Sequence, residues 1–355
     1  MTDLVSSRPI PRRKIGATGL ESSVLGFGSG DNAGLMVVGT PAERDEAVGL
    51  AIDAGVNYFD TAPSYGQGVA EANLGKALGK RRDQVILVTK VEIMPADRHR
   101  MADRVHDSLA ASLRRLGTDH VDVVEIHNPP RFAHDWDKLV WTPLVPDDYL
   151  REGGALAGLD AVISAGMACH GGIACESVEP AALEVVVGEP LVEVLNVWLN
   201  VTNPSALIPR TDSQVRGATD FRGIAAAAAR HDVGISAFRT LAGGAAMSAI
   251  SGVLDRHPYA GGAYKFNQQW YEREVQMATH IIRALSLNDI AAAVEFFYRF
   301  AITDHRVSTS IGGFSELAHL TAAISAVQKG PLSEADYEQV LTTWRGLFTV
   351  PADAA

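Results

Sequence analysis

Four residues with reactive side chains follow short apolar segments in the first half of the chain. Asp60 follows the segment 56–59, and Tyr65 lies five residues further on. Lys90 follows the apolar segment that begins at residue 85, and His127 follows the one that begins at residue 121. If these segments are strands of one closed parallel sheet, their carboxyl ends face the same mouth, and the four side chains converge there. An acid, a phenol, an amine and an imidazole at one mouth indicate a site that transfers protons.

The chemistry of these side chains favours protonation of an oxygen atom. A tyrosine phenol titrates near ~10, so at neutral pH Tyr65 can donate a proton to a developing alkoxide. We expect Lys90 to lower the pKa of Tyr65 by favouring the phenolate, and Asp60 to keep Lys90 charged and oriented. His127 can donate a hydrogen bond to a substrate carbonyl. The sequence has no metal-ligand triad and no Ser-His-Asp order, so the site can protonate an oxygen but lacks a nucleophile. Reduction of a carbonyl there would need a hydride from another source, which implies a nicotinamide cofactor.

The elements that must position these residues are strands and helices in alternation. Near-continuous runs of Val, Ile and Leu are typical of parallel strands buried on both faces. Most of the runs are separated by helical patterns, which predicts an α/β fold, a (β/α)₈ TIM barrel with a parallel eight-stranded core. The predicted strands are 23–27, 56–59, 85–89, 121–126, 167–173, 192–198, 233–238 and 306–311.

The helix boundaries are marked by capping residues. Thr40 and Pro41 occupy the N-cap and first helical positions of a predicted helix, and Glu43 completes a capping box. A second helix repeats apolar residues at spacings of three and four from Val105 and ends at Gly117. The alanine-rich run 225–229 predicts a helix packed closely on the barrel.

Three long segments follow strand ends, at 128–148, 202–220 and 243–268. They are rich in Pro, Gly and aromatic residues, and loops of this length are commonly functional. We therefore predict long loops over the carboxyl-terminal mouth of the barrel. Aromatic side chains on or near them could hold a sugar ring or a flat polyketide, and these are Phe132, Trp136, Trp141, Trp198 and Tyr259. Asn128, beside His127, is a further candidate for binding a hydroxylated substrate.

Composition limits the possible partners of the chain. The 355 residues are predicted to form one domain, 1–355, and 31 basic against 42 acidic residues give a formal charge of −11. This charge opposes binding to nucleic acid or to an anionic membrane. No apolar stretch reaches the ~18 residues of a membrane span, and residues 1–14 lack the apolar segment of a signal peptide.

The two cysteines, Cys169 and Cys175, are too few for a disulfide framework, which favours a cytoplasmic location. Their spacing does not match a zinc knuckle and no second pair occurs, so we expect no metal site. We predict that both cysteines are buried in strands.

At several motifs the chain resembles the aldo-keto reductase superfamily. The similarity extends from about residue 16 to residue 313 and is strongest before residue 129. Its motifs are Phe59–Gly66, Glu71–Leu78, Thr89-Lys90, Ser108–Gly117, Asp119–Asp122 and Ile126–Pro129. The resemblance implies that Asp60, Tyr65, Lys90 and His127 form the family's catalytic tetrad. Tyr65 would then be the general acid in reduction and the general base in oxidation.

The resemblance also implies a set of cofactor contacts. Gly28 and Ser29 at the first strand end would touch the cofactor through their backbone. Asn196 matches the family's amide contact on the sixth strand, and Phe238 matches the aromatic ring that stacks on nicotinamide. The family's Ser-Asn pair after the fifth strand is replaced here by Ala174-Cys175. Further candidates near the last two strands are Arg239, Leu241, Gly312, Gly313, Phe314 and His319.

The family's users of NADP(H) commonly carry a Lys or Arg after the last strand, where this chain has Gly313 and Phe314 and then His319. A 2′-phosphate would lose charge-assisted hydrogen bonds worth ~1.5–3 kcal/mol each. The cofactor is therefore expected to be NADP(H) or NAD(H), with a preference for NAD(H), unless Arg239 supplies the missing charge.

The sequence thus predicts an NAD(P)(H)-dependent oxidoreductase that interconverts a carbonyl (aldehyde, ketone or sugar) and the corresponding alcohol. Its partner is a small carbonyl or hydroxyl compound, and its oligomeric state is left open. Two alternatives remain open as well. One is a non-catalytic binding subunit that retains the cofactor, and the other is a sugar-modifying enzyme that uses the nicotinamide transiently, as in epimerisation or elimination.

Overall fold

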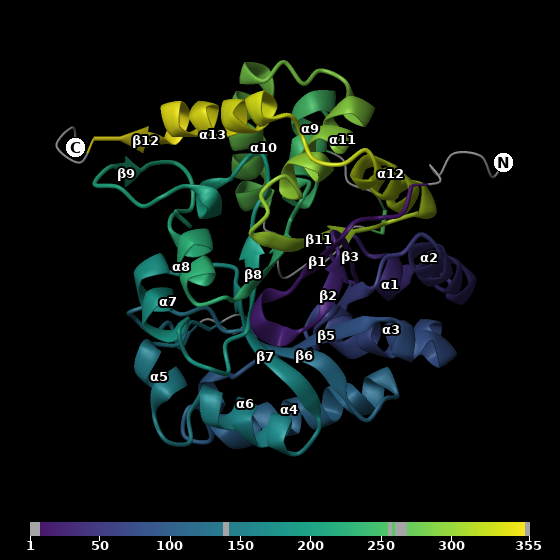
Figure 1. Ribbon diagram of the computed structural model, residues 1–355, viewed down its shortest axis with the longest axis vertical. Helices are drawn as coiled ribbons and strands as arrows, with labels where there is room; N and C mark the ends of the chain where they lie inside the picture. Colours follow the sequence, from purple (N-terminus) through teal and green to yellow (C-terminus); the bar gives the residue numbers. More distant parts are fainter. Residues whose placement is uncertain (1–7, 138–141, 255–257, 260–267, 352–355) are drawn as a thin grey trace.

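In a computed structural model of the chain, eight parallel strands form a closed barrel in the order β10-β11-β3-β4-β5-β6-β7-β8 (Figure 1). The structure describes residues 8–137, 142–254, 258–259 and 268–351. The barrel strands are β3 (Leu25–Gly28), β4 (Tyr58–Asp60), β5 (Ile86–Val91), β6 (Val121–Ile126), β7 (Ala168–Cys175), β8 (Val194–Trp198), β10 (Gly234–Phe238) and β11 (Val307–Gly313). All eight predicted strands are confirmed, and the fold is a (β/α)₈ TIM barrel.

Alternation along each strand decides which side chains fill the barrel. Tyr58, Val88 and Val123 pack inside it with Ile86, Val194 and Ile311, above Ile15 from the N-terminal segment. The next inward positions toward the carboxyl ends are Asp60, Lys90 and Glu125, because side chains two residues apart share a face. The interior is therefore apolar at its base and charged near the mouth.

Thirteen α-helices are found among the described residues, and most of them cover the outside of the barrel. Between strands lie α2 (Pro41–Asp53), α3 (Val69–Leu78), α4 (Met101–Leu116), α6 (Ala155–Ser164), α7 (Pro180–Val186) and α8 (Ile224–Arg230), with the short α1 (Leu35–Val38) and α5 (Pro146–Leu150). Later helices are α9 (Ala245–Ser251), α10 (Gln268–Ala284), α11 (Ile290–Ala301), α12 (Leu317–Gln328) and α13 (Glu334–Phe348).

The predicted helix boundaries are confirmed where they can be compared. The Thr40 hydroxyl accepts a hydrogen bond from the Glu43 amide at 3.2 Å, and the Glu43 carboxylate accepts one from the Thr40 amide at 2.7 Å, which closes the capping box at the start of α2. Helix α4 ends at Gly117 with a positive φ of 67°, as its predicted C-terminal glycine requires. The alanine-rich run forms α8, whose Ala225, Ala227 and Ala228 are buried.

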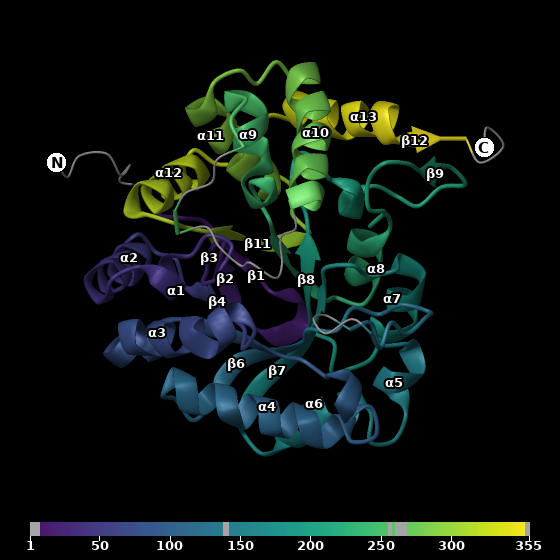
Figure 2. The same cartoon turned by 180° about the vertical axis from the view of Figure 1, so that it is seen from behind.

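The three long segments differ from the predicted loops. Segment 128–148 is closed by a bridge between Pro130 and Leu144 and leads into α5. Segment 202–220 carries β9 (Gln214–Val215), which pairs with β12 (Thr349–Val350) after α13, and both views place this pair at the periphery of the molecule (Figures 1 and 2). Segment 243–268 forms α9 and the first residue of α10, while Trp141 and residues 260–267 lie outside the described part.

Helices α9, α10 and α11 lie together beyond the ends of β10 and β11 in both views (Figures 1 and 2). These three helices connect β10 to β11 along the chain, whereas one helix between two successive strands is enough for a (β/α)₈ barrel. Their position makes them a wall beside the last two strand ends. No helix among the described residues has the length and apolarity to span a bilayer.

Candidate active site

A cavity of about 550 Å³ opens at the carboxyl ends of the strands. Its wall includes Asp60, Tyr65 and His127, so three members of the predicted tetrad meet at one cavity. Lys90, the fourth, is 1% exposed and lies beneath them. Strand ends from β4, β5 and β6 thus converge at the barrel mouth, as the parallel topology requires.

Lys90 contacts both Asp60 and Tyr65. Its ammonium donates hydrogen bonds to Oδ2 of Asp60 at 2.5 Å and to the carbonyl of Thr61 at 3.0 Å. The same nitrogen lies 5.3 Å from the centre of the Tyr65 ring. Burial alone lowers the pKa of Lys90, but Asp60 and other neighbouring groups raise it overall, so the side chain stays charged.

The shift in the pKa of Tyr65 differs from the sequence-based expectation. Burial raises the pKa of the phenol, Lys90 lowers it and Asp60 raises it again, and the net shift is upward. The ring is partly exposed to the cavity, where solvent or a ligand reduces the effect of burial. In the ligand-free protein Tyr65 is therefore a firmly protonated acid. The predicted lowering by Lys90 is present, but burial of the phenol and the charge of Asp60 together outweigh it.

His127 is oriented by a residue that the sequence did not single out. Its Nδ1 lies 3.0 Å from Oε1 of Glu92, which follows the end of β5. The imidazole ring meets the ring of Tyr65 edge-on, with centroids 6.2 Å apart. With Nδ1 directed at a carboxylate, a hydrogen bond to a substrate falls to Nε2. The position of Glu92, two residues after Lys90, was the available signal.

Seven of the ten predicted cofactor residues line the cavity. They come from the ends of four different strands and from helix α12, and they are Gly28, Asn196, Phe238, Arg239, Leu241, Gly313 and His319, with Arg239 considered separately below. The amide nitrogen of Asn196 donates to the Ser236 hydroxyl at 3.0 Å, which fixes the orientation of the side chain.

Three predicted cofactor residues are placed elsewhere, outside the cavity wall. The Ser29 amide already donates to the Asp60 carbonyl at 2.9 Å. Phe314 is buried against Phe27, with ring centroids 5.4 Å apart. A Cβ at Gly312 would lie 2.6 Å from the Phe314 ring, so this glycine allows the aromatic side chain to pack closely. The turn after β11 is thus shaped by packing between Gly312 and the Phe314 ring.

The predicted substrate residues also lie outside the cavity wall. The Asn128 side chain accepts from the Ile93 amide and donates to the carbonyls of Ile93 and Thr142, so its amide is committed to the backbone. Trp136 stacks on His134 at 4.4 Å. Trp198 is buried beneath Phe238 and Arg239. These positions do not support direct substrate binding by the three residues.

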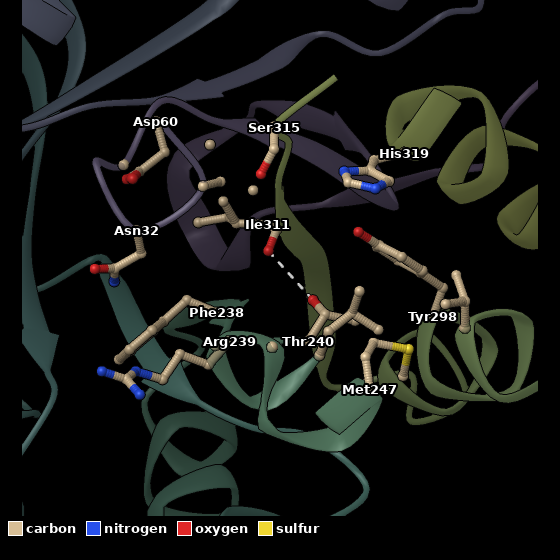
Figure 3. Close-up of a pocket in the computed structure, with 18 of the residues that line it drawn as sticks. Asn32, Asp60, Phe238, Arg239, Thr240, Met247, Tyr298, Ile311, Ser315 and His319 are labelled. Atoms are coloured by element: carbon tan, nitrogen blue, oxygen red, sulfur yellow. Dashed lines mark hydrogen bonds between the residues drawn. The ribbon is translucent and has the colours of Figure 1, made fainter. Parts of the chain in front are cut away.

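Arg239 occupies one end of the cavity. Its guanidinium lies 4.2 Å from the Trp198 ring and 3.2 Å from Oε1 of Glu176, at the end of β7. Figure 3 places Arg239 and Asn32 on the side of Asp60, and His319 and Tyr298 on the opposite side. Arg239 therefore does not supply the charge that the sequence lacks near His319.

Several lining residues were missed by the sequence reasoning. Glu176 directly follows β7 and Thr240 lies two residues after β10, which was the available signal. The others belong to the loop after β3, to the turn before α9 and to α9 itself, to α10 and α11, to β11 or to the region of α12. Of these, the sequence places only the residues of segment 243–268 near the mouth. The others are Gly30, Asn32, Ala33, Gly243, Gly244, Met247, Ser248, Ser251, Tyr271, Ile290, Val294, Tyr298, Ile311, Ser315 and Ala322.

The two cysteines differ from one another. Cys175 is buried, and burial raises the pKa of its thiol. Cys169 is exposed at the amino-terminal end of β7, so the prediction of two buried cysteines is wrong for this residue. No cluster of three or more metal-ligating side chains occurs in the described parts of the chain.

Residues 24–344 match the model of the aldo/keto reductase family. The chain belongs to the aldo/keto reductase family. It is 38% identical over 122 residues to the aldo-keto reductase YhdN of Bacillus subtilis, which covers 32% of this chain and 37% of that one. It is also 38% identical over 125 residues to L-galactose dehydrogenase of Arabidopsis thaliana, covering 34% and 38%. The matched part thus spans less than two fifths of the length of these two relatives.

Among solved structures, an aldo-keto reductase of Bacillus halodurans in its holo form superposes with a TM-score of 0.64. The match covers 94% of this chain and 96% of that one, at 18% sequence identity. At this low identity, the superposition establishes the shared barrel fold alone. The family membership rests on the match over residues 24–344.

Proposed function

We propose that this aldo/keto reductase family member is an NAD(P)(H)-dependent oxidoreductase that interconverts a carbonyl and the corresponding alcohol. The observation that carries the proposal is the buried Asp60–Lys90 ion pair beneath Tyr65 at the cavity wall. Tyr65 donates the proton in reduction and accepts it in oxidation, and His127 orients the substrate oxygen. Two electrons and a hydrogen would be supplied by the nicotinamide when it is bound.

The volume and the lining of the cavity support the binding of a dinucleotide. Its volume of about 550 Å³ is in the range of cofactor sites, and it runs from the tetrad to the N-terminus of α12. Phe238 presents a flat ring to the cavity, and Asn196 presents a polar amide. At the other end, Gly313 and Ser315 precede α12, whose N-terminal amides favour an anionic group. We propose that these residues hold the cofactor.

For the substrate, we propose a small aldehyde or a sugar. The Arg239–Glu176 pair offers hydrogen-bond donors and acceptors at the tetrad end of the cavity. L-galactose dehydrogenase, a partial relative, is named for a sugar.

Assaying a panel of simple aldehydes, aldoses and sugar alcohols with each nucleotide tests the proposal. Net change in nicotinamide absorbance supports it, and product formed without such change would indicate transient use of the cofactor instead. Binding of the nucleotide with no turnover on any substrate would indicate a non-catalytic subunit.

We further propose that the protein binds NAD(H) at least as tightly as NADP(H). Arg239 is the one Lys or Arg among the described lining residues, and it lies away from His319. His319 lies 3.4 Å from the carboxylate of Glu316, and both side chains are about half exposed. A 2′-phosphate near them would meet a carboxylate, which opposes its binding.

Titration of the protein with NADH and NADPH should therefore give a lower or equal Kd for NADH. Replacing Ser315 by arginine should shift the preference toward NADPH by about tenfold or more, because a guanidinium forms charge-assisted hydrogen bonds with phosphate. Ser315→Gln, a long but uncharged side chain, should leave the preference near that of the parent. A tenfold or greater preference of the parent for NADPH would refute the proposal.

A further inference from the structure

Glu125 is a buried carboxyl group inside the barrel, directly below the candidate active site. It lies on β6 two residues before His127, and it is 0% exposed. Its Oε2 is 4.0 Å from the Lys90 ammonium. Neither carboxyl oxygen has a hydrogen-bond partner among the residues that the structure describes. Lys90 therefore stands between two carboxyl groups, Asp60 on one side and Glu125 on the other.

The barrel provides space for this side chain at Gly172 on β7. A Cβ at Gly172 would lie 2.5 Å from the Val194 carbonyl and 3.1 Å from Cγ of Glu125. Val123, the preceding inward residue of β6, packs in the apolar layer below. An apolar residue at position 125 would extend that layer without the cost of burying a carboxyl group. Packing alone thus gives no reason for an acid here.

The titratable groups that interact with Glu125 come from three neighbouring strands. Lys90 on β5 and Asp60 on β4 act on Glu125, and Glu125 in turn raises the pKa of Tyr58 on β4 and of Cys175 on β7. Burial raises the pKa of Glu125 to about 8, against the opposing effect of Lys90 and with the support of Asp60. The group therefore changes charge at mildly alkaline pH.

We propose that Glu125 is a positioning residue that sets the net charge of the cluster it forms with Asp60 and Lys90, and thereby the pH range in which Tyr65 acts. This inference rests on the proposed function. At low pH Glu125 is neutral, and the three groups carry no net charge. When Glu125 ionises, the cluster becomes negative, and a negative charge disfavours the Tyr65 phenolate. Tyr65 then stays protonated, and can donate its proton, up to a higher pH. Its action as a base in oxidation begins at a correspondingly higher pH.

Glu125→Gln removes this charge and preserves the shape of the side chain. In the variant, we expect the alkaline limb of the reductive kcat/KM profile to move to lower pH by about one unit, as one charge through an effective dielectric of ~20 would produce. The oxidative profile should rise at correspondingly lower pH. Asp122→Asn removes a carboxylate from the other end of β6 and should leave both profiles in place.

A second measurement reports on Glu125 without turnover. The pKa of this group is raised in the folded protein, so its contribution to stability is full below the pKa of the unfolded chain and is lost as pH rises through about 8. The parent should therefore lose thermal stability relative to Glu125→Gln between mildly acidic pH and pH 8. Infrared difference spectra should show a protonated carboxyl band in the parent that disappears over the same range and is missing in the variant.

The outcomes separate the two proposals. Lack of turnover in the parent on every substrate and with either nucleotide would overturn the proposed function, and the inference with it. Turnover whose pH profiles are the same in parent and Glu125→Gln would overturn the inference alone, as would a Glu125 carboxyl that is ionised throughout. A shifted profile together with a titrating carboxyl band supports it.

Discussion

Replacing Tyr65 by phenylalanine is expected to lower turnover by about 100-fold or more, the scale of a lost general acid. The substitution removes one hydroxyl from the cavity wall and leaves the ring that lies over Lys90. Nucleotide binding should survive, because the proposed nucleotide contacts lie on other residues. The measurement is steady-state turnover in both directions, combined with a fluorescence titration of NADH.

Tyr337→Phe is the matched control for this variant. It removes a phenol of the same kind from α13, where the hydroxyl donates to Asp304 at 2.8 Å, outside the cavity wall. Its effect should appear in stability and not in turnover. If Tyr65→Phe retained the turnover of the parent, Tyr65 would not be the proton donor, and the role proposed for the tetrad would be wrong.

Replacing Lys90 by methionine should damage both activity and stability. The ammonium is the positive partner of Asp60 and lies near Glu125, and both acids are almost fully buried. Removing one partner of a buried ion pair typically costs about 3–5 kcal/mol, because the other charge is left uncompensated. Turnover should fall by about 100-fold or more, since the Tyr65 phenolate also loses its nearest positive charge.

Urea unfolding of Lys90→Met measures the loss of stability, and Lys80→Met, at an exposed position, provides the control. The surface variant should change the free energy of unfolding by no more than about 0.5 kcal/mol. Adding Asp60→Asn to Lys90→Met should restore part of the stability without restoring turnover, because the uncompensated carboxylate is gone. Parent-like stability of Lys90→Met would show that the pair is not strongly coupled.

The barrel and the tetrad could be predicted because both depend on local patterns. Short apolar runs between capped helices define parallel strands, and the residue after each run must face the mouth. Asp60, Lys90 and His127 follow directly from this rule, and Tyr65 follows from its nearness to Asp60. The same rule could have identified Glu92 and Glu176, which stand just beyond the ends of β5 and β7.

Other features were decided by contacts between distant parts of the chain. Asn128 follows His127 at a strand end, yet its amide is bound by Ile93 and Thr142, partners that only the folded loop brings within reach. Segment 202–220 was expected over the mouth, but pairing of β9 with β12 holds it at the periphery. Segment 243–268 does reach the cavity, but as helix α9 and not as the expected loop, and the sequence of α10 and α11 beside it gives no sign of the site.

The sequence by itself determined which chemistry converges at the mouth, since strand direction and alternation fix the direction of each side chain. Tertiary structure decided how that chemistry is tuned. The pKa of Tyr65 moves upward, not downward, because burial and the charge of Asp60 outweigh the effect of Lys90. Burial depends on every neighbouring element at once, and no local pattern in the chain records it.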